Sequence, residues 1–306
     1  MLRKLIIITG PTGVGKTPLG VNVACTLAGE VISADSRQLY RYMNIGTAKP
    51  DPLELAKVKH HGLDLKDPDE RTNAGQFVKY ARTLCEGLWQ RGVVPVMVGG
   101  TGLYIQAFLD GLWAEESQAE EIRATLEQRL QVEGLSRLYD ELGHLDPVAH
   151  SRVTAGDTQR VLRALELALT GNGKRGIGAE PFDCTPLAFC LHRERAELNH
   201  RLDLRVDNMM EQGLMSEVEG LLARGYHRQT FGLQSLGYQE LMDFSEGRCS
   251  RAVALARIKL RTRQYAKRQV TWFRKDRRYR WLDLGVWGRE GASQSVLEQF
   301  RNHSGF

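Results

Sequence analysis

Apolar residues in the first hundred positions alternate between short continuous runs and stretches in which they recur every three or four residues. Continuous runs of this length predict buried strands, and the 3.6-residue spacing predicts amphipathic helices. The expected strands are 5–9, 31–34 and 93–98, and the expected helices are 16–28, 73–91 and one from about 102. Strands that alternate with helices are typical of a parallel sheet with its ligand at the carboxyl ends of the strands.

The pattern changes after about Trp113. From there to Leu169 only helical spacing is present, with charged residues between the apolar ones. A glycine-rich stretch at 171–178 predicts a flexible linker, and 187–191 again reads as a strand. The chain is therefore predicted to be an α/β protein with a parallel sheet core flanked by helices and an all-helical insertion domain. The core is predicted to comprise 1–112 and 186–306, with the insertion domain at 113–185 between them.

The turn after the first expected strand carries a phosphate-binding motif. It reads Gly10, Pro11, Thr12, Gly13, Val14, Gly15, Lys16 and Thr17, which is G-x-x-x-x-G-K-[ST] between a strand and a helix. Glycines let successive N–H groups point at anionic oxygens, and the helix adds its positive N-terminal end. Lys16 is expected to reach the phosphate oxygens, and the Thr17 hydroxyl to hold Mg²⁺. The motif predicts a P-loop NTPase-like core that binds a chain of phosphates, without saying whether these belong to a nucleotide.

Two further residues at strand ends are candidates for chemistry. Asp35 ends the second expected strand, where a carboxylate can bind Mg²⁺, act as a general base or cap a turn. Thr101 lies between glycines at a strand-to-helix turn, where it can cap the helix and also offer a hydroxyl to the same crevice. The adjacent His60 and His61 have no third ligand at a suitable spacing, so a metal site there is not favoured.

The net charge of +5 conceals one strongly basic segment. Between Arg251 and Arg280 the chain has twelve Lys or Arg and a single acid, Asp276, for a charge of +11, whereas the remainder sums to −6. Such asymmetry indicates a polyanionic partner or a solvated basic helix. The aromatic residues within the segment and directly after it favour nucleic acid, since bases stack on aromatic rings. These residues are Tyr265, Trp272, Phe273, Tyr279 and Trp281.

Another basic pair lies in the expected insertion, where Arg160 and Arg163 are three residues apart on a helix. That spacing suits phosphate contacts and equally suits an ion pair with Glu166.

The bulk composition excludes several classes. No run of about 18 apolar residues predicts a membrane span, and no membrane partner is expected. Residues 1–4 lead directly into a strand, so no signal peptide and a cytoplasmic location are expected. Five cysteines without a C-x-x-C pair predict thiols rather than a metal site. A monomer is expected.

With these motifs in order, the chain resembles the tRNA dimethylallyltransferases, P-loop prenyltransferases that modify an adenosine beside the anticodon. The resemblance covers nearly the whole chain. The matching segments are GPTGVGKT at 10–17, ISADSRQLYRYMNIGTAKP at 32–50, HHGLDLKDP at 60–68, VGGTGLYIQA at 98–107, GDTQRVLRALE at 156–166, SLGYQEL at 235–241 and TRQYAKRQVTWFRKD at 262–276.

The resemblance implies that the P-loop cradles the diphosphate of dimethylallyl diphosphate, with Mg²⁺ at Thr17. It makes Asp35, Thr101 and Lys16 the candidate catalytic residues. Asp35 would accept a proton from the N6 amine of adenosine 37 of tRNA. Contacts with the tRNA anticodon stem-loop are implied for three groups: Asp35, Ser36, Arg37, Gln38 and Thr101; Arg123, Gln159, Arg160, Val161, Leu162 and Arg163; and Arg263, Lys267 and Arg268.

Three positions depart from the family pattern. Pro18 replaces a helix former, although proline is tolerated in a first helical turn. Gln234 stands where some members have an arginine, and Gly62 replaces an apolar residue after the histidines.

Two other functions stay open. An adenylate isopentenyltransferase would use free AMP, ADP or ATP, but it needs neither the insertion nor the basic segment. An RNA-binding P-loop NTPase would need a second acidic strand end with switch loops, whereas 93–98 runs into glycines.

Overall fold

The computed structural model describes residues 3–112, 118–170 and 180–302. The chain divides into two compact units, each with its own hydrophobic core. The core unit comprises Met1–Phe108 with Phe182–Phe306, and the helical unit comprises Leu109–Pro181. The insertion expected at 113–185 thus begins and ends four residues earlier. The glycine-rich stretch at 171–178 lies outside the described residues.

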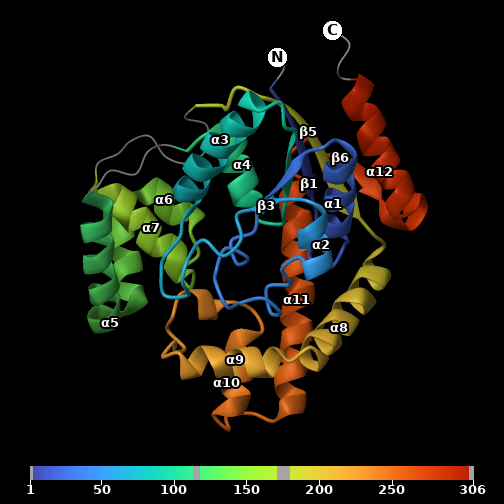
Figure 1. Ribbon diagram of the computed structural model, residues 1–306. Coiled ribbons are helices and arrows are strands. Elements are labelled where there is room, and N and C mark those ends of the chain that lie inside the picture. Colours follow the sequence, from blue (N-terminus) through green and yellow to red (C-terminus); the bar gives the residue numbers. More distant parts are fainter. Residues whose placement is uncertain (1–2, 113–117, 171–179, 303–306) are drawn as a thin grey trace. The chain divides into compact units, whose positions relative to one another are not determined.

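The core unit is built on a six-stranded parallel sheet (Figure 1). The strand order is β3-β2-β4-β1-β5-β6. The strands are β1 (Lys4–Thr9), β2 (Glu30–Ser33), β3 (His60–His61), β4 (Pro95–Val98), β5 (Thr185–His192) and β6 (Arg280–Asp283). The parallel α/β core and four of these strands confirm the sequence prediction, whereas β3 and β6 were not predicted. β5 begins at Thr185, inside the segment predicted to be insertion.

The central strands are buried on both faces. Ile6 of β1 pairs with Val96 of β4 and with Leu187 of β5, and these side chains are at most 2% exposed. This double burial explains why β1 reads as a continuous apolar run rather than as an alternating one. The edge strand β6 is different, because Arg280 and Trp281 are exposed and only Leu282 is buried.

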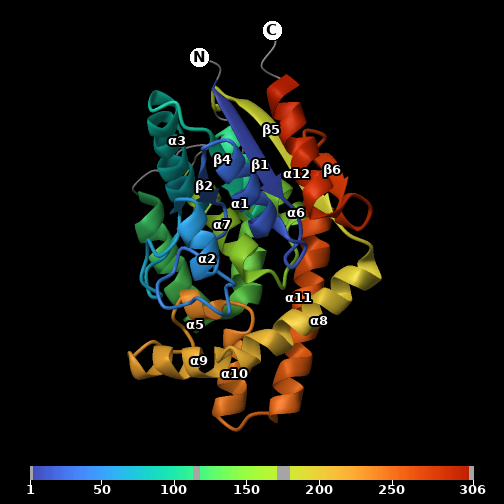
Figure 2. The same cartoon turned by 45° about the vertical axis from the view of Figure 1, so that its right-hand side comes forward.

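Helices cover both faces of the sheet (Figure 1 and Figure 2). Leu19 and Val23 of the first helix and Val296 of the last pack on the face that carries Ile6 and Ile8. The helices of the core unit are α1 (Lys16–Thr26), α2 (Pro52–Lys57), α3 (Ala74–Gln90), α4 (Gly102–Asp110), α8 (Arg195–Glu211), α9 (Leu214–Ala223), α10 (Tyr238–Ser245), α11 (Arg251–Phe273) and α12 (Leu284–Asn302), with a short 3₁₀ helix η1 (Gly232–Gln234). After β5 the described residues are mainly helical, with β6 as the one further strand among them.

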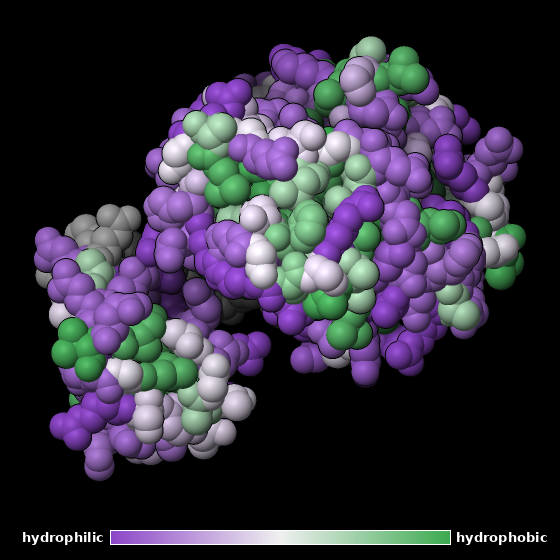
Figure 3. All heavy atoms as spheres, turned by 90° about the horizontal axis from the view of Figure 1, so that it is seen from below, coloured by the Kyte–Doolittle hydropathy of each residue, from purple (hydrophilic) through white to green (hydrophobic). Residues whose placement is uncertain are grey.

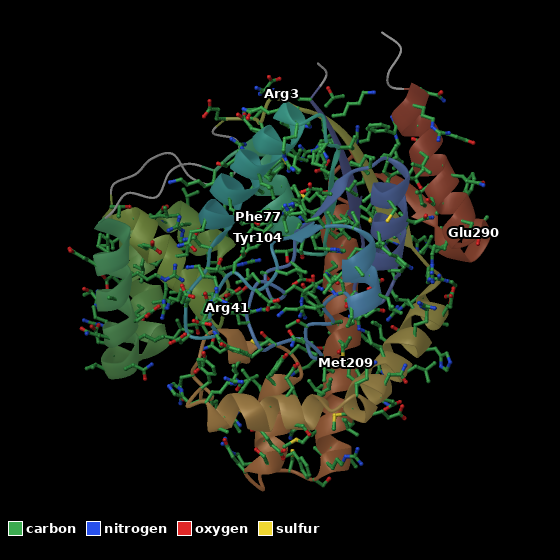
Figure 4. The ribbon with its side chains drawn as sticks, in the orientation of Figure 1. Arg3, Arg41, Phe77, Tyr104, Met209 and Glu290 are labelled. Atoms are coloured by element: carbon green, nitrogen blue, oxygen red, sulfur yellow. The ribbon has the colours of Figure 1, made fainter. Side chains whose placement is uncertain are left out.

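The helix boundaries follow local capping chemistry. Asn73 accepts a hydrogen bond from the Gln76 N–H, so α3 begins at Ala74, one residue after the predicted start. Phe77 of α3 and Tyr104 of α4 stack with ring centroids 4.5 Å apart, which joins the two helices on their face of the sheet (Figure 4). Seen from below, the core unit shows apolar side chains in the middle of the face and hydrophilic ones around them (Figure 3).

The helical unit contains α5 (Gln118–Leu145), α6 (Pro147–Arg152) and α7 (Thr158–Leu169). Its own small core includes Leu126 and Leu142 of α5 and Val161 and Leu165 of α7. Asp146 and Asp157 accept backbone hydrogen bonds at the starts of α6 and α7. The purely helical character predicted for the insertion is confirmed for its described residues.

All five cysteines lie in the described residues and are free thiols, as the sequence predicts. Among the described residues, no helix combines the length and the apolar character needed to cross a membrane.

Candidate active site

The P-loop joins β1 to α1 and depends on its glycines. Gly10, Gly13 and Gly15 have φ values of 138°, 75° and 112°, which other residues rarely adopt. A Cβ at Gly10 would lie 2.6 Å from the carbonyl oxygen of Leu191 in β5, so the loop also lies too close to the sheet for a side chain. The helix continues through Pro18, because the first N–H groups of a helix have no intrahelical acceptor to lose.

Lys16 folds back over this loop. Its ammonium donates hydrogen bonds to the carbonyl oxygens of Gly10 at 3.0 Å and Pro11 at 2.8 Å. Burial lowers the pKa of Lys16 to about 8; Asp35 opposes this shift and Arg205 adds to it. The ammonium is thus held where an anion bound by the loop amides would be its natural partner.

A cavity of about 250 Å³ lies beside the loop, and we call it the phosphate cavity. Its lining brings together five of the eight predicted P-loop residues, Thr12, Gly13, Gly15, Lys16 and Thr17, with the predicted Asp35 and Gln38. Gly10, Pro11 and Val14 do not line it, and the Val14 side chain is buried in the hydrophobic core. Other lining residues include Thr47, Ala48, Pro50, His60, Arg201 and Arg205. Thr17 and Asp35 supply a hydroxyl and a carboxylate to the same space, and oxygen donors of this kind suit Mg²⁺ beside a bound diphosphate. The residues present therefore fit the expected magnesium ion.

A second cavity, of about 360 Å³, adjoins the first, and we call it the acceptor cavity. Four residues line both cavities: Thr12, Asp35, Thr47 and Arg205. The predicted Ser36, Arg37 and Arg268 line the acceptor cavity, together with Tyr265 of α11. Asp35 thus lies where a group bound by the P-loop would meet a group in the acceptor cavity.

Asp35 is held by a local turn at the end of β2. Its Oδ1 accepts a hydrogen bond from the Arg37 N–H at 2.9 Å, so one of the alternatives in the sequence, a turn-capping role, is present. The second carboxylate oxygen is not used by that turn. Asp35 can therefore hold the turn through one carboxylate oxygen and still use the other oxygen in a reaction.

Thr101 supports the segment that follows Asp35. Its hydroxyl accepts a hydrogen bond from the Ser36 N–H at 3.0 Å, while its carbonyl oxygen accepts from the Tyr104 N–H at the start of α4. The residue occupies the N-cap position as expected, but its side chain is used across to Ser36. Thr101 thereby ties the end of β2 to the turn after β4.

Gln38 is engaged with the protein through both ends of its amide. Its Oε1 accepts from the Ser33 hydroxyl at 2.9 Å, and its Nε2 donates to the carbonyl oxygens of Ala48 and Thr47 at 2.9 and 3.3 Å. A direct contact between this amide and tRNA, as the resemblance implies, would require these bonds to be exchanged.

Two arginines of α8 complete the phosphate cavity and were missed in the sequence. Arg201 and Arg205 both line it, and the Arg201 Nε donates to the Gly13 carbonyl oxygen at 3.3 Å. Burial lowers the pKa of Arg205, and the Asp35 carboxylate opposes that shift. The available signal was their i,i+4 spacing, which places both on one face of a helix that directly follows a core strand.

Gln269 of α11 was also missed. Its Oε1 accepts from the Thr12 N–H of the P-loop at 2.8 Å, and its Nε2 donates to the Gly100 carbonyl oxygen at 2.9 Å. A Cβ at Gly100 would lie 2.3 Å from this amide nitrogen, so the glycine after β4 is needed for the contact. One buried amide thus fixes the P-loop against the neighbouring strand end.

The basic residues predicted on α11 fall into different environments. Arg263 forms an ion pair with Asp203 of α8 at 2.5 and 2.7 Å, so its charge is already compensated. Arg268 lies over the Tyr265 ring at 5.8 Å and lines the acceptor cavity, and Lys267 is exposed. Of the three, Arg268 presents its charge to the acceptor cavity, and Lys267 presents its charge to solvent.

In the helical unit, the predicted residues separate into exposed and buried sets. A shallow groove of about 400 Å³ is lined by Arg123, Gln159, Arg160 and Arg163. Arg163 also pairs with the buried Glu166 at 2.7 Å, so the ion pair is confirmed, whereas the phosphate contact stays a prediction.

The remaining two predictions in α7 need correction. Val161 and Leu162 are 0% and 8% exposed and pack in the core of the helical unit. Their apolar side chains form the inner face of the same helix, so they stabilise the groove and do not form part of its surface.

The paired histidines, and the two residues Gln234 and Gly62 that differ from the family pattern, lie in different parts of the core unit. His60 lines the phosphate cavity with its Nδ1 2.9 Å from the Val58 carbonyl oxygen, and His61 lies 2.5 Å from the Glu30 carboxylate. In the described residues, no group of three His, Cys, Asp or Glu side chains is arranged to hold a metal. Gln234 lines the acceptor cavity. A Cβ at Gly62 would meet the Ser33 carbonyl oxygen at 2.9 Å, which accounts for the glycine there.

Comparison with known proteins places this geometry in a family context. The model of the IPP transferase family matches residues 38–276, and that of isopentenyl transferases matches residues 3–69. Relatives named tRNA dimethylallyltransferase include one from Desulfosudis oleivorans, 42% identical over 287 residues, covering 92% of this chain and 91% of the relative. Another, from Carboxydothermus hydrogenoformans, is 40% identical over 306 residues and covers 98% of both chains.

Solved structures agree with the sequence comparison. A tRNA delta(2)-isopentenylpyrophosphate transferase from Staphylococcus epidermidis superposes with a TM-score of 0.74 at 32% identity, covering 98% of this chain and 99% of that one. A eukaryotic dimethylallyltransferase described as acting on tRNA gives a TM-score of 0.78 at 26% identity, covering 98% and 80%.

Proposed function

This chain belongs to the IPP transferase family, among relatives named tRNA dimethylallyltransferase, and from that premise we propose that it transfers a dimethylallyl group to tRNA. The donor in this proposal is dimethylallyl diphosphate, and the acceptor is the N6 amine of adenosine 37 beside the anticodon. The observation that carries it is the position of Asp35, which lines the phosphate cavity and the acceptor cavity at once.

The donor half of the reaction uses the P-loop. The carbon–oxygen bond between the allylic carbon and the diphosphate breaks, and its electron pair leaves with the diphosphate oxygen. Loop amides, Lys16 and Arg205 are preorganised cationic or hydrogen-bonding groups around that leaving group, and such groups are most effective where charge develops. Mg²⁺ held near Thr17 would neutralise further charge on the same oxygens.

The acceptor half uses Asp35. The adenine nitrogen donates its electron pair to the allylic carbon, and the proton that it must lose passes to the Asp35 carboxylate. An exocyclic amine is a weak nucleophile, so a positioned base contributes a rate factor of about 10²–10⁴. The same residue would remain fixed during this step, because its other oxygen is held by the Arg37 N–H.

The acceptor base must leave its stack to enter the acceptor cavity. Enzymes that act on a base meet this cost by extruding the nucleotide and holding its flanking backbone. Tyr265 and Arg268 line the cavity itself, and the arginine groove of the helical unit is suited to phosphates. Both features support a polynucleotide acceptor rather than a free mononucleotide.

The test follows the prenyl label. The protein is incubated with labelled dimethylallyl diphosphate, Mg²⁺ and either unmodified tRNA, AMP or ATP. Label is expected on tRNA alone, and digestion to nucleosides should place it on N6 of one adenosine. Label on AMP but not on tRNA would instead assign an adenylate isopentenyltransferase. ATP hydrolysis without prenyl transfer would favour the RNA-binding NTPase.

A further inference from the structure

An irregular loop at residues 44–50 forms a wall shared by three cavities of the core unit. Gly46 and Thr47 line the acceptor cavity, and Thr47, Ala48 and Pro50 line the phosphate cavity. A larger cavity of about 1030 Å³ beside the P-loop is lined by the same loop at Asn44, Ile45, Ala48, Lys49 and Pro50. Met209 of α8, labelled in Figure 4, lines this cavity and the acceptor cavity. A shift of the loop would therefore change the space in which a group bound by the P-loop meets a group in the acceptor cavity, since Thr47 lines both cavities.

A single carboxylate from a distant helix holds one end of this loop. Glu217 of α9 accepts hydrogen bonds through Oε2 from the N–H groups of Asn44 at 2.7 Å and Ile45 at 2.8 Å. Its Oε1 accepts from the Gly46 N–H at 3.0 Å and from the Tyr238 hydroxyl at 2.7 Å. Four donors on two oxygens saturate the carboxylate, and bonds to an ionised acceptor are stronger than neutral ones.

The fit around this carboxylate is close. A Cβ at Gly46 would lie 2.5–2.6 Å from atoms of the Tyr238 ring, so only glycine allows the loop to approach the ring. Tyr238 is fully buried at the start of α10, and the loop is thus seated on a rigid region of the core unit.

The other end of the loop is tied to the segment that carries Asp35. Gln38, three residues after Asp35, donates to the carbonyl oxygens of Thr47 and Ala48. The loop is therefore held from both sides: its amides by Glu217 and its carbonyls by Gln38. Displacement at the Glu217 end would be transmitted to the residues on either side of Asp35.

We propose that Glu217, supported by Tyr238, is a positioning residue for the transfer reaction, which fixes the 44–50 loop so that the two substrates meet at Asp35. This inference rests on the proposed function, because it concerns the alignment of the diphosphate and the acceptor. The effect belongs to the rate of the chemical step rather than to diphosphate binding, since the P-loop amides and Lys16 are not bonded to Glu217.

The sharpest variant is Glu217→Gln. An amide has one accepting oxygen, so one of the two donor pairs loses its acceptor. The least costly arrangement turns the new NH₂ toward the Tyr238 hydroxyl, which can rotate to accept from it, and leaves the Gly46 N–H without its partner. Tyr238→Phe alone removes one of the four bonds and keeps the ring that supports Gly46. Glu219→Gln is the matched control, because Glu219 is exposed on the same helix and the variant removes the same charge.

The experiment measures kcat for transfer to tRNA, the KM values of both substrates and the Kd of inorganic pyrophosphate, with thermal unfolding of each variant. Glu217→Gln is expected to lower kcat by up to about 100-fold, the cost that a misplacement of about 1 Å can reach, while the Kd of pyrophosphate stays unchanged. Tyr238→Phe should lower kcat by a smaller factor, and Glu219→Gln should match the parent protein.

Two results for Glu217→Gln would overturn the inference. One is an unchanged kcat. The other is a loss of pyrophosphate binding that parallels a loss of thermal stability, because that result would show that Glu217 has only a structural role. If Glu217→Gln does not fold, Tyr238→Phe decides, and a normal kcat in that variant overturns the inference. If the parent protein and Glu219→Gln both fail to prenylate tRNA, the proposed function fails instead.

Discussion

Lys16 combines two demands that conflict, because it must be charged to bind an anion and yet its ammonium lies partly withdrawn from water. Burial lowers its pKa to about 8 from 10.5. Between these values the unfolded chain binds more protons than the folded one, so the free energy of unfolding should rise with pH across that window. Below about pH 8 the charged Lys16 lowers the free energy of unfolding. The same partly desolvated charge can interact strongly with a phosphate bound in the site.

The same shift predicts how diphosphate binding depends on pH. Binding of dimethylallyl diphosphate without tRNA should weaken as pH rises above about 8, by up to about tenfold per unit, because the deprotonated amine must first recover a proton. The ligand itself keeps a constant charge there, since the second phosphate pKa is about 6. Equilibrium binding from pH 7 to 9.5 measures this effect.

Arg205→Gln provides the control for that prediction. The Arg205 charge contributes to the lowered pKa of Lys16, so its removal should move the loss of affinity to higher pH while weakening binding at every pH. An affinity of the parent protein that is flat from pH 7 to 9.5 would show that Lys16 does not titrate in this range.

Asp35→Asn tests the proposed base without disturbing its turn. The Asn side chain keeps an oxygen that can accept from the Arg37 N–H, so the end of β2 should hold its shape. We expect kcat to fall by about 10²-fold or more, with tRNA affinity nearly unchanged, because the carboxylate acts on the reacting amine. Single-turnover rates and tRNA binding separate the two effects. A near-normal rate would remove Asp35 from the proton transfer.

At the scale of the elements, α11 carries polar residues with different tasks. Gln269 fixes the P-loop, and Arg263 pairs with Asp203 of α8. Arg268 lines the acceptor cavity, and Lys267 is exposed to solvent. The basic character that was visible in the sequence is thus divided between internal structure and a candidate RNA surface.

The double variant Lys267→Ala, Arg268→Ala should weaken tRNA binding and flatten its salt dependence. Each lost phosphate contact reduces the slope of log K against log salt by about 0.7–0.9. Lys259→Gln removes a charge from the same helix at a site already paired with Asp207 at 2.7 Å, and serves as the control. The measurement is the Kd for tRNA at several salt concentrations. A slope equal to that of the parent protein would assign this segment of α11 to structure alone.

Elements defined by local pattern could be predicted, and those defined by distant contacts could not. The P-loop and Asp35 follow from short motifs next to buried strands. β3 has only two residues, and β6 exposes Arg280 and Trp281, so neither has an apolar run to detect. The first boundary of the insertion was predicted at 113 instead of 109, because α4 continues the helical pattern to Asp110 across the point where the units divide.

The missed site residues share one physical reason. Arg205, Glu217 and Gln269 lie on helices, where charged or polar residues at such spacing are ordinary surface positions. Their roles depend on partners far along the chain: Gln269 bonds Thr12, 257 residues away, and Glu217 bonds Asn44, 173 residues away. No local pattern contains that information.

At the scale of the whole molecule, each unit is stabilised by a separate set of elements. The main hydrophobic core draws on the sheet, α1 and α12, and the second core draws on α5 and α7, with Ala149 of α6 packed against it. The chain leaves and re-enters the core unit at adjacent points, because the rings of Phe108 and Phe182 meet with centroids 4.9 Å apart. The residues between them could be shortened without stretching the core unit.

Replacement of residues 110–180 by a short Gly-Ser linker should therefore yield a folded core unit. We expect cooperative unfolding and an unchanged Kd for dimethylallyl diphosphate, because the phosphate cavity is built from core residues alone. Prenyl transfer to tRNA should fall by at least about tenfold, since the arginine groove and its phosphate contacts are removed.

The full-length triple variant Arg123→Gln, Arg160→Gln, Arg163→Gln is the matched comparison and should lose some of the same activity. Full tRNA activity in the shortened protein would show that the helical unit does not take part in tRNA recognition, and a failure to bind dimethylallyl diphosphate would show that the core unit depends on it to fold.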